Sequence, residues 1–270
     1  DIVGMAVLAI NLRDKCPKLA DELIIFHDGI SSKDQSLVKE IFPCRFLLYQ
    51  YKINKKTKWK NSSLTYFSDM VFCKFECFRL LNEFETVIWT DYDILIRKPL
   101  DELTQGESVF KTMINRTPLR AMFFDSIDSC PSFSFDMEGD SVSTALIVLK
   151  RGIGDYNEFY RWCYEQTEKY AQYLYLPEQA IFTMLIQYFD LRYERLDEQI
   201  YAPHPSDYEE KASIIHAYGQ PKFWNGLRNE QWEAYYQKWR QMGGSAYRGP
   251  VKRKLIKFIQ DRILKWRHKA

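Results

Sequence analysis

The chain has 270 residues, of which 46% are apolar and 16% aromatic, and its formal net charge is +2. This length fits one large α/β domain with a short appendage, or two small domains, and the apolar content is ample for a packed core. No apolar run approaches the length needed to cross a bilayer, and no secretion signal is visible, so we expect neither a membrane span nor a signal peptide.

The first 90 residues alternate between helical and strand-like patterns. The patterns predict a helix over 3–13, a strand over 22–27, a helix from 31 to about 42, a strand over 44–51, a basic loop over 52–61, a helix over 65–83 and a strand over 87–90. Ser31 and Asp34 have the spacing of a capping box, which marks the start of the second helix. The segment therefore predicts successive strand and helix units.

The remainder of the chain continues the alternation after a long irregular segment. We expect a strand over 109–114, a loop over 115–141, a strand over 145–149, a helix over 154–173, a helix beginning at Pro177, an extended segment over 191–201, a strand over 213–217 and a helix over 228–242. Strands that alternate with helices predict an α/β fold with a mostly parallel, Rossmann-like sheet flanked by helices.

The six cysteines do not form a regular disulfide or metal-binding pattern. Cys73 and Cys77 lie one helical turn apart within an apolar run, so we interpret them as core residues. We therefore expect reduced thiols and a cytoplasmic chain.

Two carboxylates, Asp91 and Asp93, follow the apolar strand 87–90 directly. Residues two apart in a strand point to the same side, so both carboxylates would project together from the strand end. Like charges at such a short distance favour a divalent cation that both can bind. A charged loop after an edge strand is the alternative interpretation.

Several motifs occur in one order along the chain and resemble glycosyltransferase family 8. These motifs are Asp91-Tyr92-Asp93, Ser143-Thr144-Ala145, Leu176-Pro177-Glu178-Gln179 and the run from His216 through Gly219 to Lys222. The resemblance extends from about residue 4 to 225 and is weak over 105–140. It implies a GT-A fold and a retaining enzyme that uses a nucleotide sugar.

The resemblance assigns a role to each matching residue. Asp91, Asp93 and His216 would bind Mn²⁺ or Mg²⁺, a ligand set that suits such a cation. Gly219 would let the backbone approach a phosphate, and Lys222 would stabilise the departing diphosphate. The alternatives are a core or surface histidine for His216 and a solvated surface lysine for Lys222.

Three further positions complete the expected site. Gln179 would lie beneath the reacting carbon of the sugar, and Glu178 would bind donor hydroxyls where the family commonly has Asp. Lys74 would face the donor from the preceding helix. The alternatives are a helix N-terminal charge for Glu178 and a helix-surface lysine for Lys74.

Two departures from the family pattern concern the sugar and the nucleotide. Ser143-Thr144-Ala145 replaces the usual Asn-Ser-Gly or Asn-Ala-Gly, and Ser143 has a shorter reach than Asn, which affects the choice of sugar. Asp1 lies just after the position of the family's first strand. We therefore expect that the chain lacks its beginning or that its nucleotide pocket is incomplete.

The basic character of the chain is concentrated in its last residues. Residues 250–270 contain eight Lys or Arg and one Asp, a local charge of +7, which leaves −5 for the rest. We interpret this tail as an amphipathic basic helix on an anionic membrane surface at its cytoplasmic face. A helix packed on the domain or on another subunit is the alternative. No base-reading motif accompanies the tail, so we expect no nucleic-acid partner.

Together these features predict a GT-A domain over 1–226 and a helical basic region over 227–270. The expected activity is Mn-dependent transfer of a hexose, glucose or galactose, from a UDP-sugar to a glycan or glycolipid acceptor, in surface polysaccharide or lipopolysaccharide synthesis. The alternative is a non-catalytic nucleotide-sugar or glycan-binding GT-A module of a larger synthase. A homo-oligomer is left open.

Overall fold

A computed structural model describes residues 2–54, 56–59, 68–130, 133–207 and 210–249. The predicted tail helix 250–270 and the start of the predicted helix 65–83 lie outside these residues. The α-helices are α1 (Ile2–Lys15), α2 (Ser32–Ile41), α4 (Glu76–Leu80), α5 (Tyr156–Tyr170), α6 (Pro177–Tyr188), α7 (Glu198–Tyr201) and α8 (Glu230–Gln241). Short 3₁₀ turns are η1 (Asp69–Phe75), η2 (Asp101–Leu103), η3 (Leu119–Met122), η4 (Asp125–Ser129), η5 (Arg151–Ile153) and η6 (Phe223–Asn225).

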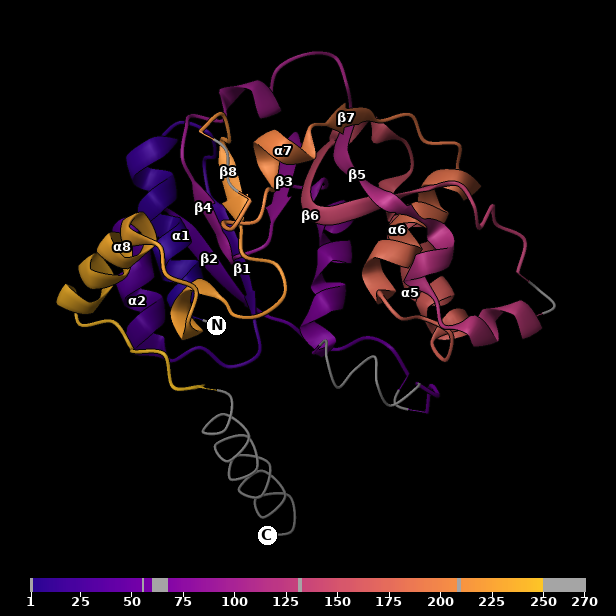
Figure 1. The fold of residues 1–270 in the computed structure, drawn as a ribbon, viewed down its shortest axis with the longest axis horizontal. Coiled ribbons are helices and arrows are strands. Elements are labelled where there is room, and N and C mark those ends of the chain that lie inside the picture. Colours follow the sequence, from indigo (N-terminus) through magenta and orange to yellow (C-terminus); the bar gives the residue numbers. More distant parts are fainter. Residues whose placement is uncertain (1, 55, 60–67, 131–132, 208–209, 250–270) are drawn as a thin grey trace, which may run out of the picture.

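The strands form three sets of hydrogen-bonded neighbours. They are β1 (Leu23–His27), β2 (Cys44–Leu48), β3 (Thr86–Thr90), β4 (Ile94–Ile96), β5 (Phe110–Pro118), β6 (Asp140–Lys150), β7 (Glu194–Leu196) and β8 (Ile214–His216). Strand β1 pairs with β2, the order β3-β6-β5-β7 forms a four-stranded sheet, and β4 pairs with β8. The α/β fold class is confirmed, with helices on the sheet faces (Figure 1).

The sheet is mixed rather than mostly parallel, which corrects that part of the expectation. Pairs β1–β2 and β5–β7 are parallel, whereas β3–β6, β5–β6 and β4–β8 are antiparallel. Strands β5 and β6 are joined without a crossover α-helix, because the described residues between them form only the short turns η3 and η4. Adjacent strands joined in this way run antiparallel.

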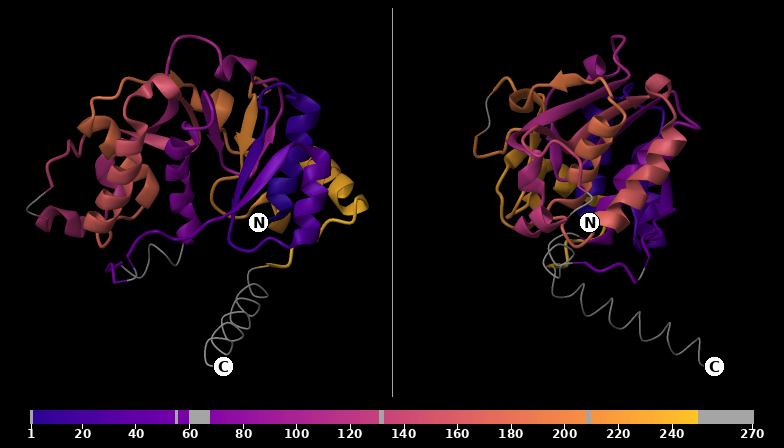
Figure 2. Two further views of the ribbon diagram at one scale, coloured as in Figure 1. Left: turned by 180° about the vertical axis from the view of Figure 1, so that it is seen from behind. Right: turned by 90° about the vertical axis from the view of Figure 1, so that its right-hand side faces the viewer.

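Two hydrophobic clusters hold the molecule together. Helices α1, α2 and α8 lie on one side of β3 and helices α5 and α6 on the other (Figures 1 and 2). The first cluster gathers α1, α2, β4 and α8, including Trp232 and Trp239. The second lies between the four-stranded sheet and helices α5 and α6, and Phe75, Phe78 and Phe182 fill its centre. Each cluster supplies one side of the site described below.

Helix α1 is buried around most of its circumference, as expected for an apolar helix at the centre of a cluster. Its one fully buried amide side chain, Asn11, is satisfied by the edge of β4. Asn11 Nδ2 donates to the Ile96 carbonyl at 3.0 Å, and Ile96 N donates to Asn11 Oδ1 at 2.6 Å. A buried polar group with both partners present costs little, and this pair fixes α1 against β4.

Local signals in the sequence place several helix ends correctly. Ser31 is the N-cap of α2, and its Oγ accepts from Asp34 N at 3.2 Å. Pro177 is the first residue of α6. Asp34 also accepts from Ser245 N at 3.0 Å and Ser245 Oγ at 2.8 Å, which fastens the segment after α8 to the start of α2.

Three predicted elements differ in kind from the structure. One is the segment 191–201, predicted as extended, which contains the helix α7 after β7. The described part of the predicted helix 65–83 is the 3₁₀ turn η1 followed by the short helix α4. Its apolar residues Phe72, Phe75 and Phe78 are three apart, a spacing that suits a 3₁₀ turn as well as an α-helix. The predicted loop 115–141 includes the end of β5, two 3₁₀ turns and the start of β6.

The cysteine and membrane expectations concern the whole chain. All six cysteines are free thiols. Among the described helices, none combines the length and the apolar character that a bilayer-crossing segment needs.

Candidate active site

The two aspartates of the Asp-x-Asp motif lie in the turn that joins β3 to β4. Backbone hydrogen bonds hold this turn from both sides, because Asp91 N donates to Ala145 O at 3.0 Å and Ala217 N donates to Asp93 O at 2.9 Å. Asp93 is buried and Asp91 is half-buried. The turn therefore connects the four-stranded sheet to the β4–β8 pair with both carboxylates held in place.

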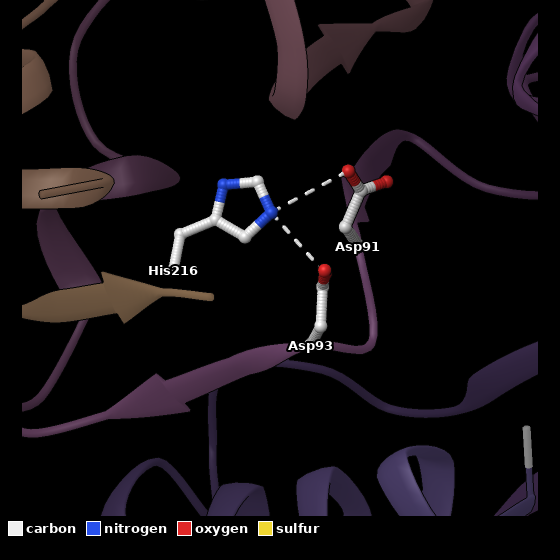
Figure 3. Close-up of side chains that lie close together, drawn as sticks. All are labelled: Asp91, Asp93 and His216. Atoms are coloured by element: carbon white, nitrogen blue, oxygen red, sulfur yellow. Dashed lines mark hydrogen bonds and ion pairs between the residues drawn. The ribbon is translucent and has the colours of Figure 1, made fainter. Parts of the chain in front are cut away.

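His216 completes a group of three side chains that could hold a metal ion. It is the last residue of β8 and lies opposite Ile94 of β4, the residue that directly follows Asp93. Its Nε2 lies 3.2 Å from Asp93 Oδ1 and 3.8 Å from Asp91 Oδ2 (Figure 3). One ligand atom from each residue lies within 4.8 Å of the others. Two carboxylates and one imidazole fit Mn²⁺ or Mg²⁺.

Lys222 lies beside this group on the turn that follows β8. Its ammonium group donates to Asp93 Oδ2 and, at 2.8 Å, to the Ala217 carbonyl. Burial by itself would raise the pKa of Asp93, but His216 and Lys222 outweigh it and hold the pKa well below its usual range. Asp93 is therefore ionised at neutral pH, as a metal ligand must be.

Gly219 forms the bend between His216 and Lys222. Its φ is +72°, a conformation that favours glycine, and no atom lies within 4 Å of the place where a Cβ would be. The backbone at this bend is thus open to a ligand on that side.

Lys74 occupies the other side of Asp91 and is almost completely buried. Its Nζ lies 3.1 Å from Asp91 Oδ1 and 3.2 Å from Glu178 Oε1, and it donates to Thr144 Oγ1 at 3.0 Å. Burial would lower the pKa of Lys74, but the carboxylates of Asp91 and Glu178 outweigh it, so the net shift is upward. Lys74 is therefore a permanent buried cation, and the surface-lysine alternative is not what the structure shows.

Glu178 carries one buried oxygen that has no partner among the described residues. Its Oε1 accepts from Lys74 and, at 3.1 Å, from Thr144 Oγ1, whereas Oε2 has no hydrogen-bond partner. A buried carboxylate oxygen without a donor is costly, so this atom is a natural acceptor for a ligand hydroxyl.

Gln179 and Ser143 lie near this group but do not contact it directly. Gln179 Oε1 accepts from Asn115 Nδ2 at 3.3 Å, which orients its amide. Ser143 Oγ accepts a hydrogen bond from Ala145 N at 3.5 Å. Because successive residues of β6 point to opposite faces, Thr144, rather than Ser143, reaches Lys74 and Glu178.

Comparison with known proteins bears directly on this arrangement. Residues 2–115 match the model of glycosyl transferase family 8. This range includes both aspartates of the motif. The resemblance to family 8 is confirmed. The prediction that the chain is a glycosyltransferase is confirmed by the same match.

Solved structures with the same fold are also glycosyltransferases. The galactosyltransferase LgtC, in complex with donor and acceptor sugar analogues, has a TM-score of 0.64 at 13% identity, covering 89% of this chain and 96% of LgtC. GlyE of Streptococcus pneumoniae has a TM-score of 0.52 at 14% identity, covering 90% and 60%. Mouse xyloside xylosyltransferase 1 has a TM-score of 0.50 at 16% identity, covering 81% and 94%. These likenesses establish the GT-A fold.

A sequence comparison with curated proteins finds no match. The family 8 match ends at residue 115, so His216, Glu178, Gln179, Gly219 and Lys222 lie beyond it. The geometry brings His216, Glu178 and Lys222 into direct contact with one of the two aspartates or with Lys74. Gln179 and Gly219 lie beside this group without such a contact.

Sequence reasoning missed three contributors to this site. Thr144 binds Lys74 and Glu178, Asn115 orients Gln179, and Trp89 Nε1 donates to Asp91 Oδ1 at 3.2 Å. The alternation of β6 would have separated Thr144 from Ser143. Asn115 fell in a segment predicted as loop, where no periodic signal places it on β5.

Proposed function

We propose that the protein is a retaining glycosyltransferase that transfers a hexose from a UDP-sugar to a glycan acceptor. The supporting observation is the convergence of Asp91, Asp93 and His216 within 4.8 Å, with Lys222 in contact with the same group. A metal site with a neighbouring lysine cation suits a nucleoside diphosphate, whose charge both can neutralise.

One group of residues around the site would bind the diphosphate, and a second group would bind the sugar. Asp91, Asp93 and His216 would hold Mn²⁺, which when bound neutralises the diphosphate and favours its departure. Lys222 would turn from Asp93 toward the phosphate oxygens, because a lysine side chain is flexible enough to exchange one anionic partner for another. The open backbone at Gly219 would accept the same phosphates.

The second group of residues faces the sugar. The unpartnered Oε2 of Glu178 would accept a donor hydroxyl, and the carbonyl dipole of Gln179 would stabilise positive charge that develops at the reacting carbon. An amide is a weak base, so Gln179 suits a front-face reaction in which the leaving phosphate helps to deprotonate the acceptor.

Titration calorimetry of UDP, with and without Mn²⁺, tests the proposal. Wild type should bind UDP in a Mn²⁺-dependent manner, and Asp93→Ala should weaken binding by about 100-fold or more. Loss of a residue that only supports a metal ligand costs about 10–100-fold in metal affinity, and loss of the ligand itself should cost more. The matched control is Asp125→Ala, because the Asp125 side chain is fully exposed.

UDP binding that is independent of Mn²⁺, or unchanged by Asp93→Ala, would overturn the metal-diphosphate site. If the site is established, release of UDP from a UDP-hexose should be faster with acceptor than without it. Retention would be read from the anomeric configuration of the product by NMR.

A non-catalytic nucleotide-sugar or glycan-binding module is the second candidate. Thr144, within the Ser143-Thr144-Ala145 departure, uses its hydroxyl inside the protein, where it binds Lys74 and Glu178. If these contacts occupy the groups that would grip the sugar, the chain would bind UDP without turnover. Turnover assays with UDP-glucose and UDP-galactose separate the two candidates.

We further propose a peripheral location on the cytoplasmic face of a membrane and a glycan or glycolipid acceptor of surface polysaccharide synthesis. The support is the +7 charge of residues 250–270. Deletion of these residues should move the protein from vesicles containing anionic lipid to the supernatant. Unchanged sedimentation would argue against the membrane.

A further inference from the structure

Strand β6 has a neighbour on each edge, and its pairing with one of them is interrupted beside the site. It lies between β3 and β5 (Figure 1). Toward β3 the register is regular. Toward β5 it moves from Ile147, opposite Thr112, to Ser143, opposite Met113. In the described pairing of these two strands, residues 144–146 therefore form a bulge that has no partner on β5.

The bulge brings polar groups of β6 to the buried lysine and to the Asp-x-Asp motif. Thr144 Oγ1 accepts from Lys74 Nζ at 3.0 Å and donates to Glu178 Oε1 at 3.1 Å. The Thr144 carbonyl accepts from the same ammonium group at 3.2 Å. The carbonyl of the next residue, Ala145, accepts from Asp91 N at 3.0 Å. Two bulged residues thus hold both the Lys74 network and the first aspartate of the motif.

The side chain of Thr112 fills the gap that the bulge leaves beside β5. Thr112 is fully buried, and its Oγ1 lies 2.9 Å from the Ser143 carbonyl and 3.3 Å from the Leu146 carbonyl. A hydroxyl has one proton to donate, so the two ends of the bulge share it. A buried carbonyl without a donor is costly, and this shared proton therefore stabilises the bulged path of β6.

A second irregularity of the same strand pair begins two residues further along β5. There the register shifts between Ile114 and Pro118, and the Asn115 side chain donates to the Val142 carbonyl at 2.7 Å. The same amide lies 3.3 Å from Gln179 Oε1. At both irregularities a polar side chain of β5 bonds to the backbone of β6 where the strands pass the site. Bulges are over-represented next to active sites, where they redirect side chains.

We propose that Thr112 is a positioning residue of this site, which acts through β6 rather than by contacts of its own with the site. Its hydroxyl holds the bulge, and the bulge determines where Thr144 meets Lys74 and where Ala145 meets Asp91. The consequence for metal binding rests on the proposed function, in which Asp91 is a ligand of the cation. The placement of Asp91 by the bulge does not rest on it.

Three variants separate positioning from a general effect on stability. Thr112→Val removes the hydroxyl and keeps the branched shape, so both bulge carbonyls lose their donor. Thr112→Ser keeps the hydroxyl. Thr167→Val is the matched control, because Thr167 is also fully buried and its hydroxyl donates to a carbonyl, that of Cys163 at 2.7 Å, within α5.

Hydrogen exchange of single amides tests the placement of Asp91 without metal or substrate. In Thr112→Val the Asp91 amide should exchange about tenfold faster than in wild type, because its acceptor lies on the loosened bulge. The Arg151 amide, which bonds at the other end of the β3–β6 pair, is the internal control for global opening. Thr112→Ser and Thr167→Val should keep the wild-type ratio of the Asp91 and Arg151 rates.

Manganese titration monitored by electron paramagnetic resonance measures the consequence for the metal group. Thr112→Val should lower the Mn²⁺ affinity by about tenfold, the lower end of the cost of losing a residue that supports a ligand. Thr167→Val should bind Mn²⁺ like wild type even where its urea midpoint falls as far as that of Thr112→Val. Thr112→Ser should also bind Mn²⁺ like wild type.

Three results would overturn the inference. The first is an unchanged ratio of Asp91 to Arg151 exchange in Thr112→Val. The second is an equal loss of Mn²⁺ affinity in Thr112→Val and Thr167→Val, which would be an effect of stability alone. The third is a wild-type Mn²⁺ affinity in Thr112→Val. If wild type itself does not bind Mn²⁺, the metal site of the proposed function is wrong, and the exchange of the Asp91 amide alone decides the role of Thr112.

Discussion

Two charge networks meet at Asp91, and they differ in how completely the protein satisfies them. On one side, Lys74 is enclosed by Asp91, Glu178 and Thr144, and its side chain is 8% exposed. On the other side, Lys222 is bound to Asp93, and its side chain is 18% exposed beside the open bend at Gly219. The first network is closed within the fold, and the second faces the space where a ligand would bind.

The difference indicates that an ion pair between lysine and a carboxylate has two uses in this protein, one structural and one in ligand binding. A buried lysine between two carboxylates holds three chain segments, η1, β6 and α6, at fixed positions around Asp91. A lysine on a glycine-containing turn can exchange one anion for another at little cost in stability. The closed network should therefore govern folding, and the open network should govern ligand binding.

Removing the buried cation should give the largest effect. Lys74→Met keeps much of the side-chain volume but leaves Asp91 and Glu178 without their common partner, so the free energy of unfolding should fall by about 3–5 kcal/mol. Urea unfolding followed by circular dichroism measures it. Lys39→Met, on the exposed side of α2, should change stability by at most about 0.5 kcal/mol. A loss below 1 kcal/mol for Lys74→Met would refute the structural role.

Removing the imidazole should weaken metal binding. His216→Ala should reduce Mn²⁺ affinity by about 10–100-fold or more, because it takes away one of three ligand groups. Manganese titration monitored by electron paramagnetic resonance gives the affinity. His204→Ala is the matched control, since His204 does not belong to the metal group. A metal affinity equal to wild type would exclude His216 as a ligand.

A smaller change tests whether α1 supports the open network. Gly4→Ala places a methyl group 2.6 Å from Tyr92 Cδ2 and 2.8 Å from Trp224 Cζ3, so the turn between the two aspartates must shift. We expect a loss of about 1–3 kcal/mol in stability and weaker Mn²⁺ binding. Gly152→Ala, whose Cβ would lie 3.5 Å from Val109, is the control. Unchanged metal binding would mean that α1 does not support the metal site.

Thiol labelling should show the smallest effect. The reactivity of Cys73, which flanks Lys74, measures how firmly the closed network is held. Burial raises the pKa of Cys73, which flanks Lys74, and of Cys163, so little thiolate forms at pH 8. The half-buried Cys44 and Cys130 should react first with a thiol reagent. In Lys74→Met, Cys73 should become reactive as η1 loosens. Fast labelling of Cys73 in wild type would mean that the closed network opens readily.

The sequence predicts features that depend on near neighbours along the chain. Ser31 and Asp34 cap α2, and the two-residue spacing of Asp91 and Asp93 brings both carboxylates to one site. Family resemblance adds His216, which is 123 residues from Asp93 and whose Nε2 lies 3.2 Å from Asp93 Oδ1. Each of these signals is a short motif that can be read from a few residues of the sequence without knowledge of the tertiary structure.

Features that depend on strand pairing could not be predicted in the same way. Thr144 reaches Lys74 only because β6 lies between β3 and β5, and Asn115 orients Gln179 only because β5 continues to Pro118. The antiparallel pairing of β5 with β6 also follows from a connection without a crossover α-helix, which composition does not reveal. Register and pairing are properties of the whole sheet rather than of any segment.

The hydrogen bonds of Asp34 set a limit on how far the chain can be shortened. Asp34 accepts from Ser31, Ser245 N and Ser245 Oγ, and it is 3% exposed. Cutting before Ser245 would leave this buried carboxylate short of two donors and would also remove the carbonyl that accepts from Trp239 Nε1. A minimal catalytic fragment should therefore retain residues through Tyr247, even though these residues lie outside the site.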